Sequence, residues 1–150
     1  MASWNGIDPL PLGWTELGRE DERDIWRRFE RKFDFRPSID KAHWPGIREP
    51  AASLTYALPP YDSLSLEKTW KSFLRALQAL SRPGQEELLV LDWQHQCYRF
   101  RPADAGPDWV IHPIPEGEYH IFLDPQLRYG TFGHPWELSL IHISEPTRPY

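Results

Sequence analysis

Two stretches of the chain carry apolar residues at the spacing of an amphipathic helix. In the first, between residues 20 and 33, the apolar stripe consists of Ile25, Trp26, Phe29 and Phe33. The second stripe spans residues 66–80 and is followed by Pro83-Gly84, a pair that stops helices. Apolar residues that recur every three or four positions indicate a helix with one buried face. The sequence therefore predicts two main helices.

Charges are ordered along the first of these helices. Acidic residues crowd its start, and basic residues crowd its end, namely Arg27, Arg28, Arg31 and Lys32. This order complements the helix dipole, which favours negative charge in the first turn and positive charge in the last. We therefore interpret the basic cluster as a solvated helix face and not as a phosphate site.

Shorter segments have the patterns of β-strands. Leu88–Trp93 is almost continuously apolar, as a central strand would be. In the segments 53–58, 97–101 and 119–124, a large apolar or aromatic residue stands at every second position, as in a strand with one buried face. Residues 131–133 are a further short candidate strand. The order of helix, strand, helix and then several strands predicts an α+β fold. We expect a mostly antiparallel sheet of about five strands, with the two main helices packed on one face.

The composition suits a small domain with an aromatic core. The chain has 150 residues, which is the length of one domain. It contains 8 Trp, 7 Phe and 6 Tyr, and aromatic side chains bury large apolar areas. The chain can therefore build a core although only 40% of its residues are hydrophobic. Its 16 Pro residues indicate many loops.

Charge and cysteine content narrow the classes of protein that fit. The net charge is −5 and no basic run lies outside the first helix, so we expect no nucleic-acid partner. No apolar run is long enough to span a membrane, and the first residues lack the pattern of a secretory signal. The single cysteine, Cys97, has no internal disulfide partner and is expected to be a small core residue. These features predict a cytoplasmic protein without a membrane partner.

Four segments of the chain together resemble one known family. They are Phe35–Ser38, Leu91–His95 with Cys97-Tyr98, Gly117–Leu123 and Gly130–Glu137. From Trp14 to Glu137 the chain resembles the bacterial family 2716 of domains of unknown function. The resemblance implies no particular activity. It does imply that one more strand and a short end segment follow Glu137.

The last residues, Leu138–Tyr150, resemble the translation of a sequencing adapter. We therefore expect residues 1–137 to form a single α+β domain and residues 138–150 to be a non-native tail without functional residues. Leu138–Ile143 is nevertheless apolar enough to occupy the place of the implied strand. We expect this stretch to join the sheet, with Pro146–Tyr150 trailing away.

Asp92, His95 and His134 are the candidate catalytic residues. Asp92 and His95 lie at the end of the predicted central strand, where an Asp can orient an imidazole and raise its basicity. His134 lies between Gly133, which permits conformations that other residues resist, and Pro135, whose φ is fixed. One hypothesis is a hydrolase or transferase that uses both histidines with Asp92 as the orienting group. The alternative is structural, with Asp92 and His95 in a hairpin turn.

Common motifs of metal and cofactor sites are missing from the sequence. It contains no HExxH or CxxC motif and no two histidines one helical turn apart, so we expect no metal. It also contains no G-x-S-x-G elbow and no glycine-rich phosphate loop. We therefore expect neither a serine hydrolase nor a cofactor.

The second functional hypothesis is a non-catalytic module that binds a protein partner, as an inhibitor or an immunity protein does. Its candidate binding residues are Trp93, Trp136, Arg36 and Glu49. Trp and Arg are enriched at the hot spots of interfaces. For Arg36 and Glu49, the alternative is a buried pair that anchors the loop after the first helix.

Three further tryptophans lie in loops or in the first segment, where burial in a core is less assured, namely Trp4, Trp14 and Trp44. Exposed Trp is unfavourable unless a partner covers it. These residues either contribute to an interface or pack at the rim of the core.

Overall fold

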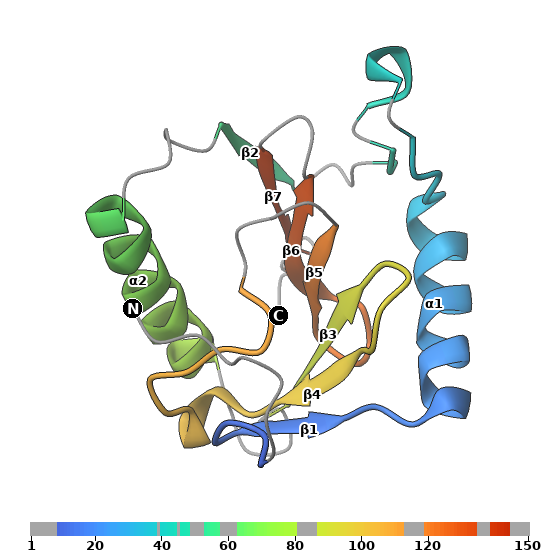
Figure 1. The fold of residues 1–150 in the computed structure, drawn as a ribbon. Helices are drawn as coiled ribbons and strands as arrows, with labels where there is room; N and C mark the ends of the chain where they lie inside the picture. The colour runs from blue at the N-terminus through green and yellow to red at the C-terminus, as the bar shows by residue number, and fades with distance from the viewer. Residues whose placement is uncertain are drawn as a thin grey trace, which may run out of the picture.

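The computed structural model describes eight segments of the chain, which are residues 9–38, 40–44, 46–48, 53–57, 63–80, 87–112, 119–134 and 139–144. In these segments a seven-stranded antiparallel sheet lies between two helices (Figure 1). The strands are β1 (Trp14–Glu16), β2 (Leu54–Ala57), β3 (Leu88–Asp92), β4 (Tyr98–Phe100), β5 (His120–Leu123), β6 (Tyr129–His134) and β7 (Ser139–Ser144). The helices are α1 (Arg19–Phe33) and α2 (Ser63–Leu80), with short 3₁₀ helices η1 (Lys41–His43) and η2 (Pro102–Asp104).

The sheet has the spatial order β1-β4-β3-β5-β6-β7-β2, and each neighbouring pair is antiparallel. The predicted α+β class, the antiparallel sheet and the two main helices are therefore confirmed. The described sheet has more strands than the five expected, because β1 and β7 were not among the strands predicted within the domain. β1 is only three residues long, too short to show an alternating pattern.

The second additional strand is β7, which pairs with β6 on one side and with β2 on the other. The expectation that the apolar stretch after Glu137 joins the sheet is thus confirmed. The trailing end expected at Pro146–Tyr150 lies outside the described residues.

The two helices cover opposite faces of the sheet, which corrects the expectation that both pack on one face. Side chains of consecutive strand residues point to opposite faces. In β3, Leu89 and Leu91 pack in the core beneath α1, whereas Leu88 and Val90 pack in the core beneath α2. Figure 1 shows α1 and α2 on either side of the strands. A strand that is apolar throughout has two faces to bury, so it needs cover on both sides.

Helix α1 follows the predicted stripe closely. Ile25, Phe29 and Phe33 are its buried residues, and the helix ends at Asp34, whose φ of 48° is left-handed. Acidic residues lie in its first turn and basic residues in its last, as the dipole favours. The basic side chains are exposed, but two of them also bind the β5–β6 turn: Arg28 donates to the carbonyl of Pro125 and Lys32 to that of Leu127.

Aromatic rings fill both cores. Beneath α1, the ring centroid of Phe35 lies 5.1 Å from that of Tyr119 and 5.4 Å from that of Phe29. On the α2 side, Trp14 stacks on Phe100 with centroids 4.4 Å apart. Trp14 is only 4% exposed, so it belongs to the core and not to an interface.

Among the described helices, none combines the length and the apolar character that crossing a membrane requires.

Gly130 lies where β5 and β6 approach each other closely. A Cβ atom there would overlap the carbonyl oxygen of Phe122 and would lie 3.1 Å from the Cα of Leu123. We expect Gly130→Ala to lower the free energy of unfolding by about 3 kcal/mol, because backbone atoms of β5 would have to move. Urea denaturation followed by tryptophan fluorescence measures this change.

The matched control is Gly106→Ala. A Cβ atom at Gly106 would meet only the side chain of Leu12, at an ordinary contact distance of 3.5 Å. Its effect should remain within about 0.5 kcal/mol. Equal effects of the two substitutions would contradict the close approach of β5 and β6.

Candidate functional site

Asp92 and His95 lie together at the end of β3. The Nδ1 atom of His95 is 3.3 Å from Oδ1 of Asp92. The backbone N–H of His95 donates to the carbonyl of Asp92, and Gln94 between them has a φ of 69°. These contacts are those of a tight hairpin turn, and the His95 side chain is 57% exposed. The structure therefore places both residues in the turn that formed the structural alternative.

His134 lies on the other face of the sheet. It packs with the α1-side aromatics, its ring centroid 5.1 Å from that of Tyr119 and 5.0 Å from that of Trp44. Its side chain is fully buried, and this burial lowers the pKa of His134 to about 4. Asp92 pairs in register with His120, which pairs with Gly133, so Asp92 and His134 point to opposite faces. The three candidate catalytic residues are therefore not brought together on one face.

His120 is a neighbour of Asp92 that the sequence did not single out. It is 7% exposed, and its Nδ1 atom lies 2.9 Å from the carbonyl oxygen of His112. Burial raises the pKa of Asp92, and the nearby His120 and His95 oppose this rise. His120 was visible as a polar residue in a predicted strand. Its place beside Asp92 follows from the β3–β5 register, which no local pattern encodes.

The four predicted binding residues have different environments. Trp93 is half-buried and packs against the α1-side core, with its ring centroid 6.0 Å from that of Tyr119. The Arg36 side chain is 81% exposed, and its Nε atom lies 3.1 Å from Oδ1 of Asp34. The interpretation of Arg36 as part of a buried pair is therefore wrong. Trp136 and Glu49 lie outside the described residues, as does Trp4.

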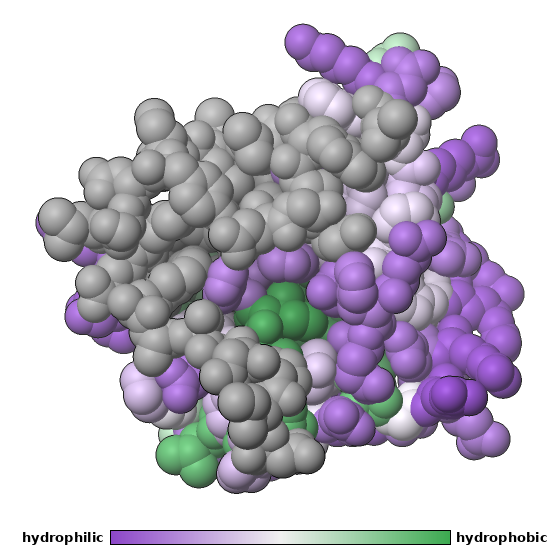
Figure 2. Space-filling model, viewed as in Figure 1, coloured by the Kyte–Doolittle hydropathy of each residue, from purple (hydrophilic) through white to green (hydrophobic). Residues whose placement is uncertain are grey.

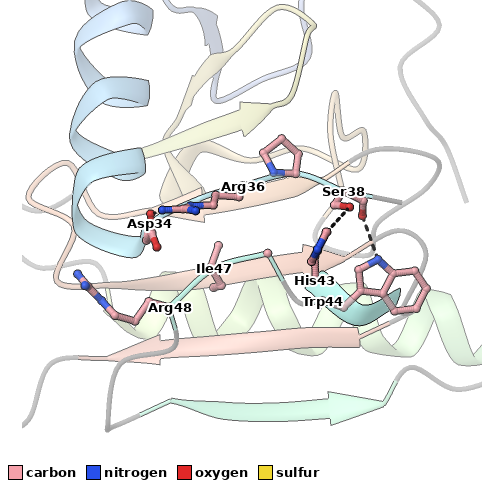
Figure 3. Close-up of a pocket in the computed structure, with 9 residues that line it drawn as sticks. Asp34, Arg36, Ser38, His43, Trp44, Ile47 and Arg48 are labelled. Atoms are coloured by element: carbon pink, nitrogen blue, oxygen red, sulfur yellow. Dashed lines mark hydrogen bonds and ion pairs between the residues drawn. The ribbon is translucent and has the colours of Figure 1, made fainter. Parts of the chain in front are cut away.

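The loop after α1 forms a concave surface with a volume of about 590 Å³. Figure 3 shows its lining, which comes from the end of α1 and the two segments that follow it. The lining residues are Asp34, Arg36, Pro37, Ser38, His43, Trp44, Gly46, Ile47 and Arg48. We call this surface the Arg36–Trp44 pocket.

Backbone hydrogen bonds fix the two sides of the Arg36–Trp44 pocket to each other and to α1. The N–H of Arg36 donates to the carbonyl of Gly46 at 2.7 Å, and the N–H of Arg48 donates to that of Phe33 at 2.5 Å. Gly46 has a φ of 81°, and a Cβ atom there would lie 3.0 Å from the carbonyl oxygen of Arg36. Glycine at this position therefore permits the close approach of the two sides.

A second set of contacts connects the pocket to the sheet. The hydroxyl of Tyr119 accepts from the N–H of Ser38 at 3.1 Å, and the indole N–H of Trp44 donates to the carbonyl of Ser38 at 2.9 Å. Trp44 in turn contacts the buried ring of His134. The wall of the pocket thus rests on core residues, although its charged groups extend into solvent.

The charged residues of the pocket lining are mainly basic on an otherwise acidic chain. Arg36 and Arg48 are basic and Asp34 is acidic, whereas the net charge of the whole chain is −5. The surface over α1 is hydrophilic in the space-filling view (Figure 2). Arg36 and Arg48 are exposed, and one N–H of the Arg48 guanidinium donates to the carbonyl of Lys32. Exposed guanidinium groups suit the binding of acidic groups.

The described residues offer neither a metal site nor a reactive thiol. No group of three or more His, Cys, Asp or Glu among them could hold a metal ion. Cys97 is fully buried, and desolvation raises the pKa of its thiol to about 12. It is therefore a small core residue, as the sequence predicted.

Comparisons with known proteins identify the family. A family model described as a protein of unknown function (DUF2716) matches residues 16–145, and the chain belongs to this family. The chain is 32% identical over 146 residues to the uncharacterised protein YxiI of Bacillus subtilis (strain 168), and the match covers 89% of each chain. No solved structure matches the chain. The resemblance inferred from the four sequence segments is thereby confirmed.

The buried His134 makes stability depend on pH. Its pKa of about 4 lies below the ordinary value of 6.5, so the unfolded chain binds a proton between these values while the folded chain does not. The stabilisation is present above pH 6.5 and is lost as the pH falls toward 4. Between pH 7 and pH 5, the wild type should lose about 2 kcal/mol more than His134→Gln. Urea denaturation at both pH values measures the difference.

His95→Gln is the control for this measurement, because His95 is exposed in its hairpin. Because this variant keeps the buried His134, it should still lose stability between pH 7 and pH 5. If His134→Gln and the wild type lost equal stability, the burial of His134 in its neutral form would be refuted.

Proposed function

We propose that this domain acts by binding a protein partner, as an inhibitor or an immunity-type protein does, and that the Arg36–Trp44 pocket is the centre of its binding surface. The observation that carries the proposal is the combination of an exposed guanidinium with an aromatic ring in one concave surface. Arg36 is 81% exposed there, and Trp44 forms part of the same lining. Arg and Trp are the residue types most enriched at interface hot spots.

The rigidity of the pocket supports the same function. Its two sides are joined by backbone hydrogen bonds, and Tyr119 and His134 hold Ser38 and Trp44 from within the core. A surface that is ordered before binding loses less conformational entropy when a partner docks. The open shape and exposed charges of the pocket are typical of protein interfaces more than of closed small-molecule sites.

The charge of the surface indicates the chemistry of the partner. The two exposed arginines of the lining, Arg36 and Arg48, favour a partner that presents Asp or Glu side chains. Trp44, which is half-buried in the lining, would contact an apolar or aromatic residue between those carboxylates. We therefore expect a short acidic and aromatic segment of the partner to occupy the pocket.

The enzymatic alternative has less support from the geometry. It required Asp92, His95 and His134 to act on one substrate, and Asp92 and His134 point to opposite faces of the sheet. His95→Ala should therefore leave binding by the Arg36–Trp44 pocket unchanged.

Selection of displayed 12-residue peptides on the immobilised domain tests the proposed function. We expect the selected peptides to be enriched in acidic and aromatic residues. Charge reversal by Arg36→Glu should weaken their binding at least about tenfold, because one charge-assisted contact becomes a repulsion. Binding should also weaken as the salt concentration rises, since exposed charges are screened. Titration calorimetry of the selected peptides gives the affinities.

Arg101→Glu is the matched control. Arg101 is also exposed and pairs with a nearby aspartate, with its Nε atom 2.9 Å from Oδ2 of Asp104, but it lies outside the pocket. Its charge reversal should leave peptide affinity within about twofold of the wild type. Selected peptides without acidic enrichment, or equal effects of Arg36→Glu and Arg101→Glu, would argue against the proposed surface.

A further inference from the structure

A second cavity lies on the opposite side of the molecule, between α2 and the sheet. Its volume is about 90 Å³. The lining residues come from α2, β3, β5 and β6 and are Phe73, Ala76, Leu77, Leu88, Phe122, Tyr129, Gly130 and Thr131. Leu77, Leu88 and Phe122 belong to the α2-side core. Ala76 is exposed, so the cavity reaches the surface along α2.

One polar side chain in this lining is buried without satisfying its hydrogen bonds. Thr131 is 5% exposed and stands opposite Phe122 in the β5–β6 register, which directs it to the α2 face. Within the described part of the chain, its Oγ1 atom has no hydrogen-bond partner. A buried hydroxyl is normally paired, and an exception calls for an explanation such as a bound molecule.

The chemistry of the lining restricts what that molecule can be. Phe73 and Phe122 are the aromatic walls, with ring centroids 5.6 Å apart in an edge-to-face arrangement. An apolar lining disfavours charged groups, which would lose their hydration. Water needs two to four polar partners to be held in a cavity, and the apolar walls supply few beside Thr131. The fitting ligand is therefore uncharged and mostly apolar, with one hydrogen-bonding group.

The size of the cavity sets the size of the ligand. Cavities of about 150 Å³ that are lined by Leu, Ile and Phe bind benzene. The cavity beside Thr131 is smaller, at about 90 Å³, but it opens at Ala76. A single ring can enter with one edge at this mouth and its polar group at Thr131.

We propose that the cavity between α2 and the sheet is a binding site for a small uncharged ring compound with one hydroxyl group, which hydrogen-bonds to Thr131. The hydroxyl of such a ligand donates one hydrogen bond to Oγ1 or accepts one from it, while the ring packs against Phe73 and Phe122. This site is separate from the Arg36–Trp44 pocket, and its occupancy does not rest on the proposed protein partner.

Phenol is the probe for this site, and benzene is the matched ligand without a hydroxyl. In titrations followed by two-dimensional amide NMR, phenol should bind saturably and shift resonances of α2, β5 and β6. Thr131→Val keeps the shape of the side chain and removes its hydroxyl, so it should weaken phenol binding about threefold to tenfold. Thr131→Ser should retain the phenol affinity to within about twofold, and benzene should bind the wild type and Thr131→Val equally.

Ala76→Phe places a larger side chain at the exposed mouth, and it should weaken the binding of both ligands. Two results would overturn the proposal. One is the absence of saturable shifts around the cavity with phenol. The other is equal phenol affinity of the wild type and Thr131→Val, which would identify the cavity as a packing gap that takes apolar molecules without using the hydroxyl. The amide spectrum of each variant shows directly whether it is folded.

Discussion

The burial of β3 and β5 on both faces is the constraint on which the other features of this molecule depend. Leu91 and Ile121 are fully buried beneath α1, and Val90 and Phe122 are fully buried on the side of α2. Consecutive strand residues face opposite ways, so each core receives every second residue of both strands. A register shift by one residue would exchange the faces and would move polar side chains such as His120 into the α1-side core. The register is therefore strongly specified.

This register also separates the chemistry of the two faces. Tyr119 and His134 face α1, where Tyr119 accepts a hydrogen bond from Ser38 and His134 packs against Trp44. Asp92 and His120 face the other way. The Arg36–Trp44 pocket therefore rests on Tyr119, which directly precedes β5, and on His134 at the end of β6, and both are far from the pocket in sequence. The cavity at Thr131 rests on the same two strands from the other side.

Local patterns predicted the elements well and their arrangement less well. The stripe of α1, the apolar run of β3 and the core position of Cys97 each follow from neighbouring residues. The assignment of α1 and α2 to opposite faces depends on which strands pair, and pairing is not local. For the same reason the sequence grouped His134 with Asp92.

The pocket was visible in part from the sequence. Arg36 was singled out because it precedes a proline in the loop after the first helix, and its exposure is now clear. Arg36 and Trp44 line the same pocket because two hydrogen bonds close the loop between them. One runs from the N–H of Arg36 to the carbonyl of Gly46, and the other from the indole N–H of Trp44 to the carbonyl of Ser38. Turn signals mark such a loop but do not give its closed geometry. The cavity at Thr131 had no sequence signal, since it results from the distance between α2 and the sheet.

Native-state hydrogen exchange tests the central role of β3 and β5 most directly. If both faces of these strands are buried as described, the amides of Val90, Leu91 and Ile121 exchange only when the whole domain unfolds. Their free energies of exchange should then equal the free energy of unfolding from urea denaturation, while amides of the edge strand β1 exchange through smaller openings. Faster exchange at Val90, Leu91 and Ile121 than in β1 would contradict this account of the fold.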